Sequence, residues 1–166
     1  MPQSLAKLWV HIIFSTRDRY PFLKNPTVQQ KVHQYIKSIC YKQDCQAMMV
    51  GGIDDHVHIL TSLSKNISIS KLVEEIKKSS SKWIKTLSPI DEALSQFYWQ
   101  RGYGAFSVSQ SALTAIKSYI QNQHIHHQQQ SFQDEFRKFL IRHDVSYPEV
   151  RFSALQHALS FQGLRP

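Results

Sequence analysis

The sequence predicts an α+β fold, an antiparallel sheet with helices packed on it in the ferredoxin-like, or split β-α-β, arrangement. Apolar residues alternate with polar ones in short segments and recur at helical spacing in longer ones. These segments follow one another as strand, helix, strand, strand, helix, strand, helix. The 166 residues are enough for one domain with a buried core. We expect this domain at residues 1–142 and a C-terminal tail or arm at residues 143–166.

Each expected element has its own local signal. Period-two alternation marks the strands, and apolar residues three and four positions apart mark the helices. Thr27 is a suitable N-cap for the first helix. Gly51-Gly52 closes the second strand, and the short connection that follows favours a hairpin. The expected elements are a strand at residues 5–15, a helix at 27–41, strands at 46–50 and 56–63, a helix at 68–88, short strands at 97–99 and 103–108, and helices at 109–128 and 131–142.

The charge of the chain favours an acidic partner. Lys and Arg number 20 against 12 Asp and Glu, which gives a net charge of +8. Nucleic acid and an anionic membrane surface are both attracted to such a protein. Six of the lysines fall between residues 65 and 85, where the expected helix offers either a phosphate-contacting surface or only a solvated face. The candidate DNA contacts are Arg17, Arg19, Lys71, Lys77, Lys78, Lys82 and Lys85.

The sequence lacks signals for export. It has no run of about 18 apolar residues, the length that crosses a bilayer. Its N-terminus shows no charged segment followed by a small-residue cleavage site. We therefore expect a cytoplasmic protein in which Cys40 and Cys45 stay reduced. A zinc site that uses these two cysteines is the less favoured alternative, because structural zinc sites bring four ligands at tighter spacing.

Two groups of residues could carry chemistry. His56 and His58 are two positions apart on an expected strand, so both imidazoles point to one face and could bind one divalent cation. Alternatively they are two structural histidines on a half-wet sheet face. Tyr119 and Gln123 are four positions apart on an expected helix and project from one side of it. A tyrosine beside an apolar stripe is otherwise a core residue whose hydroxyl reaches water.

These residues occur within a longer pattern. The segment HIIFSTRDRYPFL comes first, then His56-Val57-His58, then WQRGYGAFSVS, and last the pair Tyr119 and Gln123. In this order they resemble the single-tyrosine HUH transposases of small bacterial insertion sequences, which move as single-stranded DNA. The resemblance covers about residues 5–142. REP-associated tyrosine transposases are a related, domesticated branch of the same group.

The resemblance implies an HUH fold and a metal-dependent reaction on single-stranded DNA with hairpin ends. It implies that Tyr119 attacks the DNA to leave a 5′-phosphotyrosine and a free 3′-OH. His56, His58 and Gln123 would bind Mg²⁺ or Mn²⁺, with Mn²⁺ suited to the imidazole ligands. Asp54 or Asp55 could supply a carboxylate or orient His56. In this family the working unit is commonly a homodimer whose active sites are shared between subunits, although some relatives work as monomers.

Two other functions remain open at this point. The first is a domesticated or inactive protein that binds hairpin DNA without cleaving it. The second is a phosphoesterase that uses His56 and His58 to activate water through a metal ion. The three hypotheses differ at Tyr119, because only the transposase needs its hydroxyl as a nucleophile.

Overall fold

The structure is a computed structural model that describes residues 4–146, in two compact units at Met1–Ile125 and His126–Pro166. Most of the expected tail at residues 143–166 lies outside the described residues. Within the described part of the chain, no helix is both long and apolar enough to pass through a membrane.

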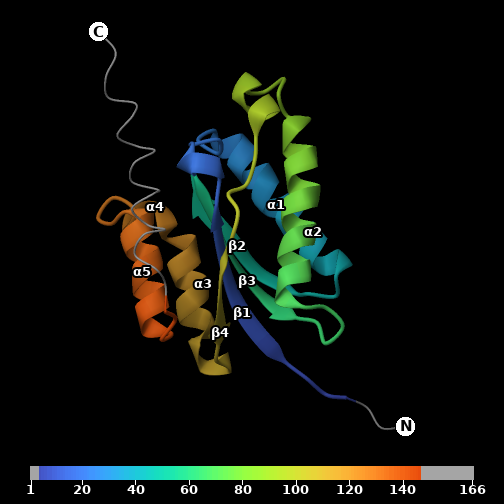
Figure 1. The fold of residues 1–166 in the computed structure, drawn as a ribbon, viewed down its shortest axis with the longest axis vertical. Helices are drawn as coiled ribbons and strands as arrows, with labels where there is room; N and C mark the ends of the chain where they lie inside the picture. Colours follow the sequence, from blue (N-terminus) through green and yellow to red (C-terminus); the bar gives the residue numbers. More distant parts are fainter. Residues whose placement is uncertain (1–3, 147–166) are drawn as a thin grey trace. The chain divides into compact units, whose positions relative to one another are not determined.

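The first unit is built on one antiparallel sheet (Figure 1). Its strands are β1 (Leu8–Ser15), β2 (Ala47–Ile53), β3 (His56–Leu63) and β4 (Gly104–Val108). They lie in the order β2-β3-β1-β4, and each neighbouring pair is antiparallel. The two long strands β1 and β3 are therefore central and the other two form the edges. This order confirms the ferredoxin-like α+β fold.

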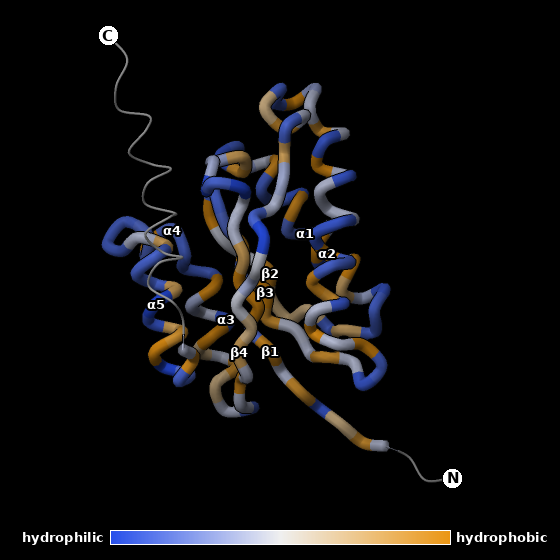
Figure 2. Tube along the Cα trace, viewed as in Figure 1, coloured by the Kyte–Doolittle hydropathy of each residue, from blue (hydrophilic) through white to orange (hydrophobic). Residues whose placement is uncertain are grey.

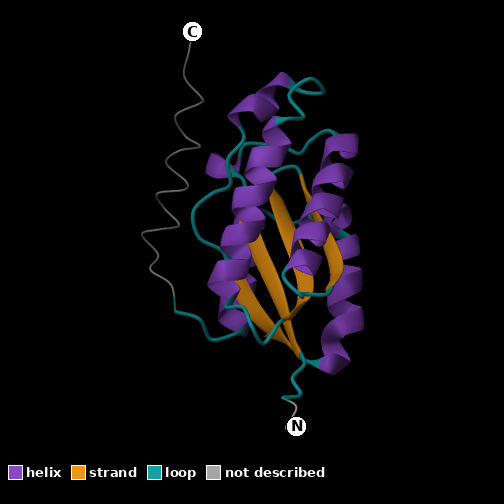
Figure 3. Ribbon diagram, turned by 90° about the vertical axis from the view of Figure 1, so that its right-hand side faces the viewer, coloured by secondary structure: helices purple, strands orange, loops and turns teal. Residues whose placement is uncertain are grey.

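Helices cover both faces of this sheet (Figure 3). Helices α1 (Pro26–Lys42) and α2 (Ile69–Lys85) pack on one face, where Val57 and Ile59 of β3 belong to the main hydrophobic core. Helix α3 (Leu113–Gln121) packs on the other face, where Leu60 meets Leu113 and Ile120 in a smaller cluster. Figure 2 shows the hydrophobic residues gathered along the strands and the inner sides of the helices. Side chains of successive residues on β3 alternate between the two cores, as the period of two requires.

Several boundaries differ from the expectation. Asn25, and not Thr27, caps α1, because its side chain accepts from the backbone N–H of Thr27 and Val28. Strand β2 continues through Gly51-Gly52 and ends at Ile53, so the hairpin turn consists of two residues only. Gly52 is required there, since its φ is 144° and an added Cβ would collide with the backbone of His56.

The remaining differences are in the second half of the chain, apart from one short helix near the N-terminus. The expected strand at residues 97–99 is a single bridge between Thr16 and Trp99. The expected helix at 109–128 is broken into three pieces: η3 (Gln110–Ala112), α3, and α4 (Gln123–His126). The break falls at Asn122, a residue type that competes poorly for helix interiors. Two more short helices, η1 (Arg17–Arg19) and η2 (Glu92–Gln96), lie in loops.

The second unit contains helix α5 (Phe132–Arg142), close to the expected range. Ser131 caps it by accepting from the backbone N–H of Asp134. His127 pairs with Glu135 of this helix at 3.1 Å between Nε2 and Oε2.

Candidate active site

Two histidines from β3 form the centre of the candidate site. His56 and His58 are both fully buried, and their ring centroids are 5.1 Å apart. They lie on the α3 side of the sheet because β3 alternates its side chains and Val57, between them, packs in the opposite core. The strand registers fix their positions further, since His56 is opposite Ser15 and His58 is opposite Ile13 on β1.

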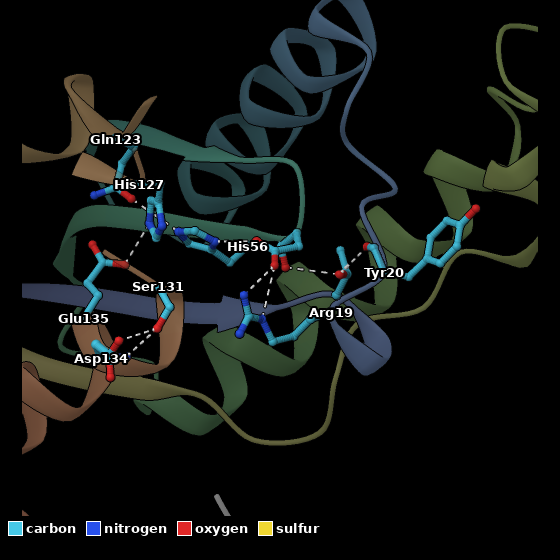
Figure 4. A network of polar contacts seen from close by, with 10 residues as sticks. Arg19, Tyr20, His56, Gln123, His127, Ser131, Asp134 and Glu135 are labelled. Atoms are coloured by element: carbon cyan, nitrogen blue, oxygen red, sulfur yellow. Dashed lines mark hydrogen bonds and ion pairs between the residues drawn. The ribbon is translucent and has the colours of Figure 1, made fainter. Parts of the chain in front are cut away.

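A carboxylate holds one of these rings. Asp55 Oδ1 lies 2.7 Å from His56 Nδ1, and Arg19 reaches the other oxygen of the same carboxylate at 2.9 Å (Figure 4). Burial disfavours the ionised form, but hydrogen bonding and charge from His56 and Arg19 outweigh it and hold the pKa of Asp55 below its usual value. The carboxylate is therefore an acceptor, and the His56 Nδ1–H donates to it. This leaves the Nε2 lone pair of His56 available to a metal ion.

The loop that carries Arg19 is shaped around this contact. Thr16 donates both its backbone N–H and its hydroxyl to the carbonyl of Asp55, at 2.8 and 3.1 Å. Asp18 and Arg19 adopt φ values of 53° and 56°, in the left-handed region that residues other than glycine seldom occupy. Such strain persists only where surrounding contacts impose it, and it gathers at functional sites. Arg19 was expected at a DNA phosphate, whereas its guanidinium here binds Asp55.

Gln123 approaches the same ring from α4. Its side chain is 1% exposed, and its Oε1 lies 3.3 Å from His56 Nε2. Because the helix of Tyr119 breaks at Asn122, Gln123 begins a new helical turn. The expectation of one continuous helix for both residues was wrong. In this contact the amide oxygen accepts a hydrogen bond from His56 Nε2–H. When Nε2 has lost that proton, both atoms present lone pairs, so a cation near both would be held by both. The donor set therefore fits a divalent metal ion.

Tyr119 lies beside the second imidazole. Its ring is half-buried, and its centroid is 5.9 Å from that of His58 and 6.5 Å from that of His11, nearly perpendicular to both. Helix α3 brings it there because Leu113 and Ile120 are buried against the sheet. The structure thus brings together four residues that the sequence singled out, from one strand and two helices of the same chain.

The helix approaches the sheet unusually closely at Gly51. A Cβ added at this position would lie 2.6 Å from Ile120 Cγ2 and 2.9 Å from the Ile120 carbonyl oxygen. Gly51 is also the β2 partner of His58. The absence of a side chain at Gly51 therefore sets how near the residue after Tyr119, and with it the tyrosine, can come to the histidine pair.

His11 is a member of the site that sequence analysis did not single out. It is 1% exposed in the middle of β1, and its Nε2 lies 2.9 Å from His58 Nδ1. The sequence did hold one signal for it, a polar residue in the middle of an expected strand with apolar residues before and after it. His33 of α1 was missed too: burial, together with nearby His124 and His56, lowers its pKa to about 4, so it is neutral at physiological pH.

The lysines expected on one cationic helix have different environments. Lys71 pairs with Glu74 and Glu75, at 3.2 and 2.9 Å. Lys77 turns inward, where its ammonium donates to the carbonyls of Gln100 and Gly102, and burial lowers its pKa to about 8. These two lysines are engaged within the protein.

The other cations of α2 face outward. Lys78 and Lys82 are exposed, and the Lys85 ammonium lies 3.7 Å from the centroid of the Tyr98 ring, which is 47% exposed. Arg17 is also exposed and lies 6.0 Å from the same ring. Beside them, α2 and residues 98–103 line a groove of about 440 Å³ that includes Lys78, Arg101 and Tyr103. An exposed aromatic ring next to several cations matches what single-stranded nucleic acid needs for stacking and phosphate contact.

Comparison with known proteins agrees with this fold. The fold is similar to that of a protein named "putative transposase" from Deinococcus radiodurans R1, with 21% identity over 74% of this chain and 95% of that one, and a TM-score of 0.58. It is also similar to a REP-associated tyrosine transposase bound to a REP hairpin, with 14% identity over 76% of this chain and 73% of that one, and a TM-score of 0.53. No curated protein matches the sequence. The family model described as Transposase IS200 like matches residues 4–123, which is most of the chain. The chain therefore belongs to the family of IS200-like transposases.

Proposed function

We propose that this transposase cleaves and rejoins single-stranded DNA through a covalent bond to Tyr119. The observation that carries the proposal is the convergence of the Tyr119 ring on a buried histidine pair, 5.9 Å from His58, with the Gln123 amide at 3.3 Å from His56. A structural tyrosine needs no ligand set beside it. A nucleophile that attacks a phosphodiester needs groups that hold and polarise the phosphate.

His56, His58 and Gln123 would hold a divalent cation, Mg²⁺ or Mn²⁺, which supplies Lewis-acid polarisation and orientation of the scissile phosphate. Tyr119 Oη gives up its proton to water and attacks the phosphorus, the bond from phosphorus to the 3′ oxygen breaks, and the 3′ oxygen takes up a proton from water to leave as a 3′-OH. The product is a 5′-phosphotyrosine. Attack by another 3′-OH reverses the step and joins two strands without an external energy source. Asp55 and Arg19 would keep His56 in the orientation that turns Nε2 toward Gln123.

We also propose a DNA path over the outward-facing cations. Arg17, Lys78, Lys82 and Lys85 are the candidates for phosphate contact, and Tyr98 and Tyr103 for stacking on unpaired bases. Lys71 and Lys77 contribute less, because carboxylates or buried carbonyls already occupy their ammonium groups. The hairpin bound to the REP-associated relative supports a hairpin as the ligand here too. The protein would then act in the cytoplasm, where the DNA is.

The homodimer stays a prediction, but the arrangement within one chain supports complete active sites in each subunit. The Tyr119 ring is 5.9 Å from the His58 ring of its own chain, which favours a nucleophile from the same subunit over the shared sites that the resemblance implies. Dimerisation would then serve to hold two DNA ends together.

The test is covalent capture of DNA. The probe is a single strand of the DNA beside the coding region, chosen to contain an imperfect palindrome, labelled near its 3′ end and incubated with Mn²⁺. We expect a labelled band at the mass of the protein plus the 3′ fragment, absent in Tyr119→Phe. Hairpin binding without an adduct would favour the inactive DNA-binding protein. Cleavage that persists in Tyr119→Phe, with no protein-linked product, would favour the phosphoesterase.

A further inference from the structure

We propose that His11 is a positioning residue of the active site, which fixes the nitrogen that His58 presents to the metal ion. The inference rests on the proposed function, because it concerns how a proposed metal ligand is prepared. Its basis is one contact between neighbouring strands: His11 Nε2 lies 2.9 Å from His58 Nδ1, and the two rings stack with centroids 5.1 Å apart. Both residues are almost completely buried.

The sheet places His11 at this position with little freedom. On β1 it is opposite Leu60 of β3, so its diagonal neighbour on the same face is His58. On its other side β1 pairs with β4, where Phe106 is opposite His11 and buried. A polar ring in such surroundings is costly unless it is hydrogen-bonded, which makes the contact with His58 a structural requirement as well.

The chemistry of the contact allows two arrangements of protons. A hydrogen bond between His11 Nε2 and His58 Nδ1 needs a proton on one of these nitrogens and a lone pair on the other. If His11 is the donor, the proton of neutral His58 is on Nε2, and that nitrogen is blocked for a metal ion. If His58 is the donor, its Nε2 carries the free lone pair that a metal ligand needs. Only the second arrangement serves the proposed reaction, and it requires His11 to carry its own proton on Nδ1.

A hydrogen bond at Nδ1 would then fix the tautomer of both proposed histidine ligands, with a different partner for each. Asp55 accepts from Nδ1 of His56. In the proposed arrangement His11 accepts from Nδ1 of His58, 2.9 Å away. Both imidazoles therefore present Nε2. The partners differ in kind, since Asp55 is a carboxylate paired with Arg19 and His11 is an imidazole ring. Partners of this kind typically change metal affinity by about 10- to 100-fold when they are removed.

The first test needs no substitution, metal or DNA. ¹⁵N–¹H correlation spectra of the uniformly ¹⁵N-labelled protein at about pH 8, above the ordinary histidine pKa, distinguish protonated from unprotonated ring nitrogens. We expect His58 with its proton on Nδ1, and His11 with its proton on Nδ1 and a bare Nε2. A proton on Nε2 of His58 would overturn the proposal, because His11 would then be the donor.

The second test uses two amide substitutions of nearly equal size. Glutamine places its terminal polar atoms close to where the Nε2 of histidine lies, and asparagine places them close to Nδ1. His11→Gln should therefore keep an acceptor for His58, while His11→Asn should not. We expect Mn²⁺ affinity, measured by electron paramagnetic resonance of the free ion, to fall by about 10- to 100-fold in His11→Asn and to stay within a few-fold in His11→Gln.

These measurements distinguish a positioning role of His11 from a packing role. They also distinguish the assignment of His11 from the proposed cleavage of DNA through Tyr119. Thermal unfolding identifies a variant that fails to fold, and the spectra of the unsubstituted protein remain decisive in that case. Equal Mn²⁺ affinity in folded His11→Asn and His11→Gln variants would mean that His11 only fills space. If the unsubstituted protein forms no adduct with DNA but shows the expected proton positions, the proposed function fails and the assignment of His11 stands.

Discussion

Gly51→Ala tests how strictly the close approach of α3 positions the nucleophile. The added Cβ would be 2.6 Å from Ile120 Cγ2 and 2.9 Å from the Ile120 carbonyl oxygen. Ordinary contacts begin near 3.4 Å, so the helix backbone has to retreat by about 0.5 Å even if the isoleucine methyl rotates away. Because Tyr119 precedes Ile120, the tyrosine moves with it. The strain should cost about 1–3 kcal/mol of unfolding free energy, as overpacking of a tight site does.

The effect on activity should exceed the effect on stability. A displacement of this order at a reacting group can lower the rate by roughly 10²-fold. We therefore expect adduct formation by Gly51→Ala to be slower by about one to two orders of magnitude at a temperature where the protein is fully folded. Mn²⁺ affinity should be nearly unchanged, since the histidines belong to the sheet. The assay is the initial rate of adduct formation with saturating DNA, beside a thermal melt.

The matched control is the double variant Gly51→Ala/Ile120→Ala. It removes the methyl contact at 2.6 Å but leaves the carbonyl contact at 2.9 Å, so it should restore the adduct rate only in part. An unchanged rate in folded Gly51→Ala would refute the argument that this glycine sets the position of Tyr119.

Three further predictions follow from the contacts described. Asp55→Asn should weaken Mn²⁺ binding by about 10- to 100-fold because the amide is a poorer hydrogen-bond partner for His56. Asp54→Asn is the control and should keep the affinity of the unsubstituted protein. Equal Mn²⁺ affinities of the two variants would mean that Asp55 does not support the metal site. Lys77 has a pKa of about 8 in the folded protein against 10.5 in the unfolded chain, so between these pH values only the unfolded chain keeps the proton. The free energy of unfolding, measured by chemical denaturation relative to Lys77→Met, should therefore rise from about pH 8 to pH 10.5. A difference between the two proteins that stays constant with pH would contradict this. Lys82→Ala should reduce the slope of log affinity for single-stranded DNA against log salt concentration by about 0.7. Lys71→Ala should reduce this slope by less, because Lys71 is already paired with a glutamate. Equal slopes for the two variants would argue against the proposed DNA path.

The sequence was a good guide where a short-range pattern determines the structure. Strand β3 occupies the expected residues because strict alternation from His56 onward leaves one register that buries Val57 and Ile59. The same alternation placed both histidines on one face. The topology was predictable as well, since the order of elements leaves few ways to connect four strands and two covering helices.

The sequence was a poor guide where contacts between distant segments decide. His11 and His58 are 47 residues apart, and only strand pairing makes them neighbours. Arg19 and Asp55 are 36 residues apart, so a loop arginine that looked ready for DNA instead holds a carboxylate. The break at Asn122 was also hidden, because the apolar spacing on either side of it continues a helical pattern. For the two distant pairs, the deciding energy comes from burial of polar groups with a specific partner.

The charged surface of α2 also shows that local patterns were predictable from the sequence and distant contacts were not. Composition identified a cluster of lysines but could not divide it into paired, buried and exposed members. Lys71 lies beside two glutamates at helical spacing, which the sequence does indicate in retrospect. The inward turn of Lys77 depends on carbonyls at Gln100 and Gly102, more than twenty residues away, and no local pattern marks it.

The most direct test of the central claim mixes two inactive proteins. Tyr119→Phe keeps the histidines without the nucleophile, and His58→Ala keeps the nucleophile without a complete ligand set. If each chain builds its own site, as the 5.9 Å separation of the Tyr119 and His58 rings implies, a mixture refolded together with Mn²⁺ and DNA stays inactive. Recovery of adduct, carried on the His58→Ala chain, would contradict the account, because that tyrosine would then act with the histidines of its partner.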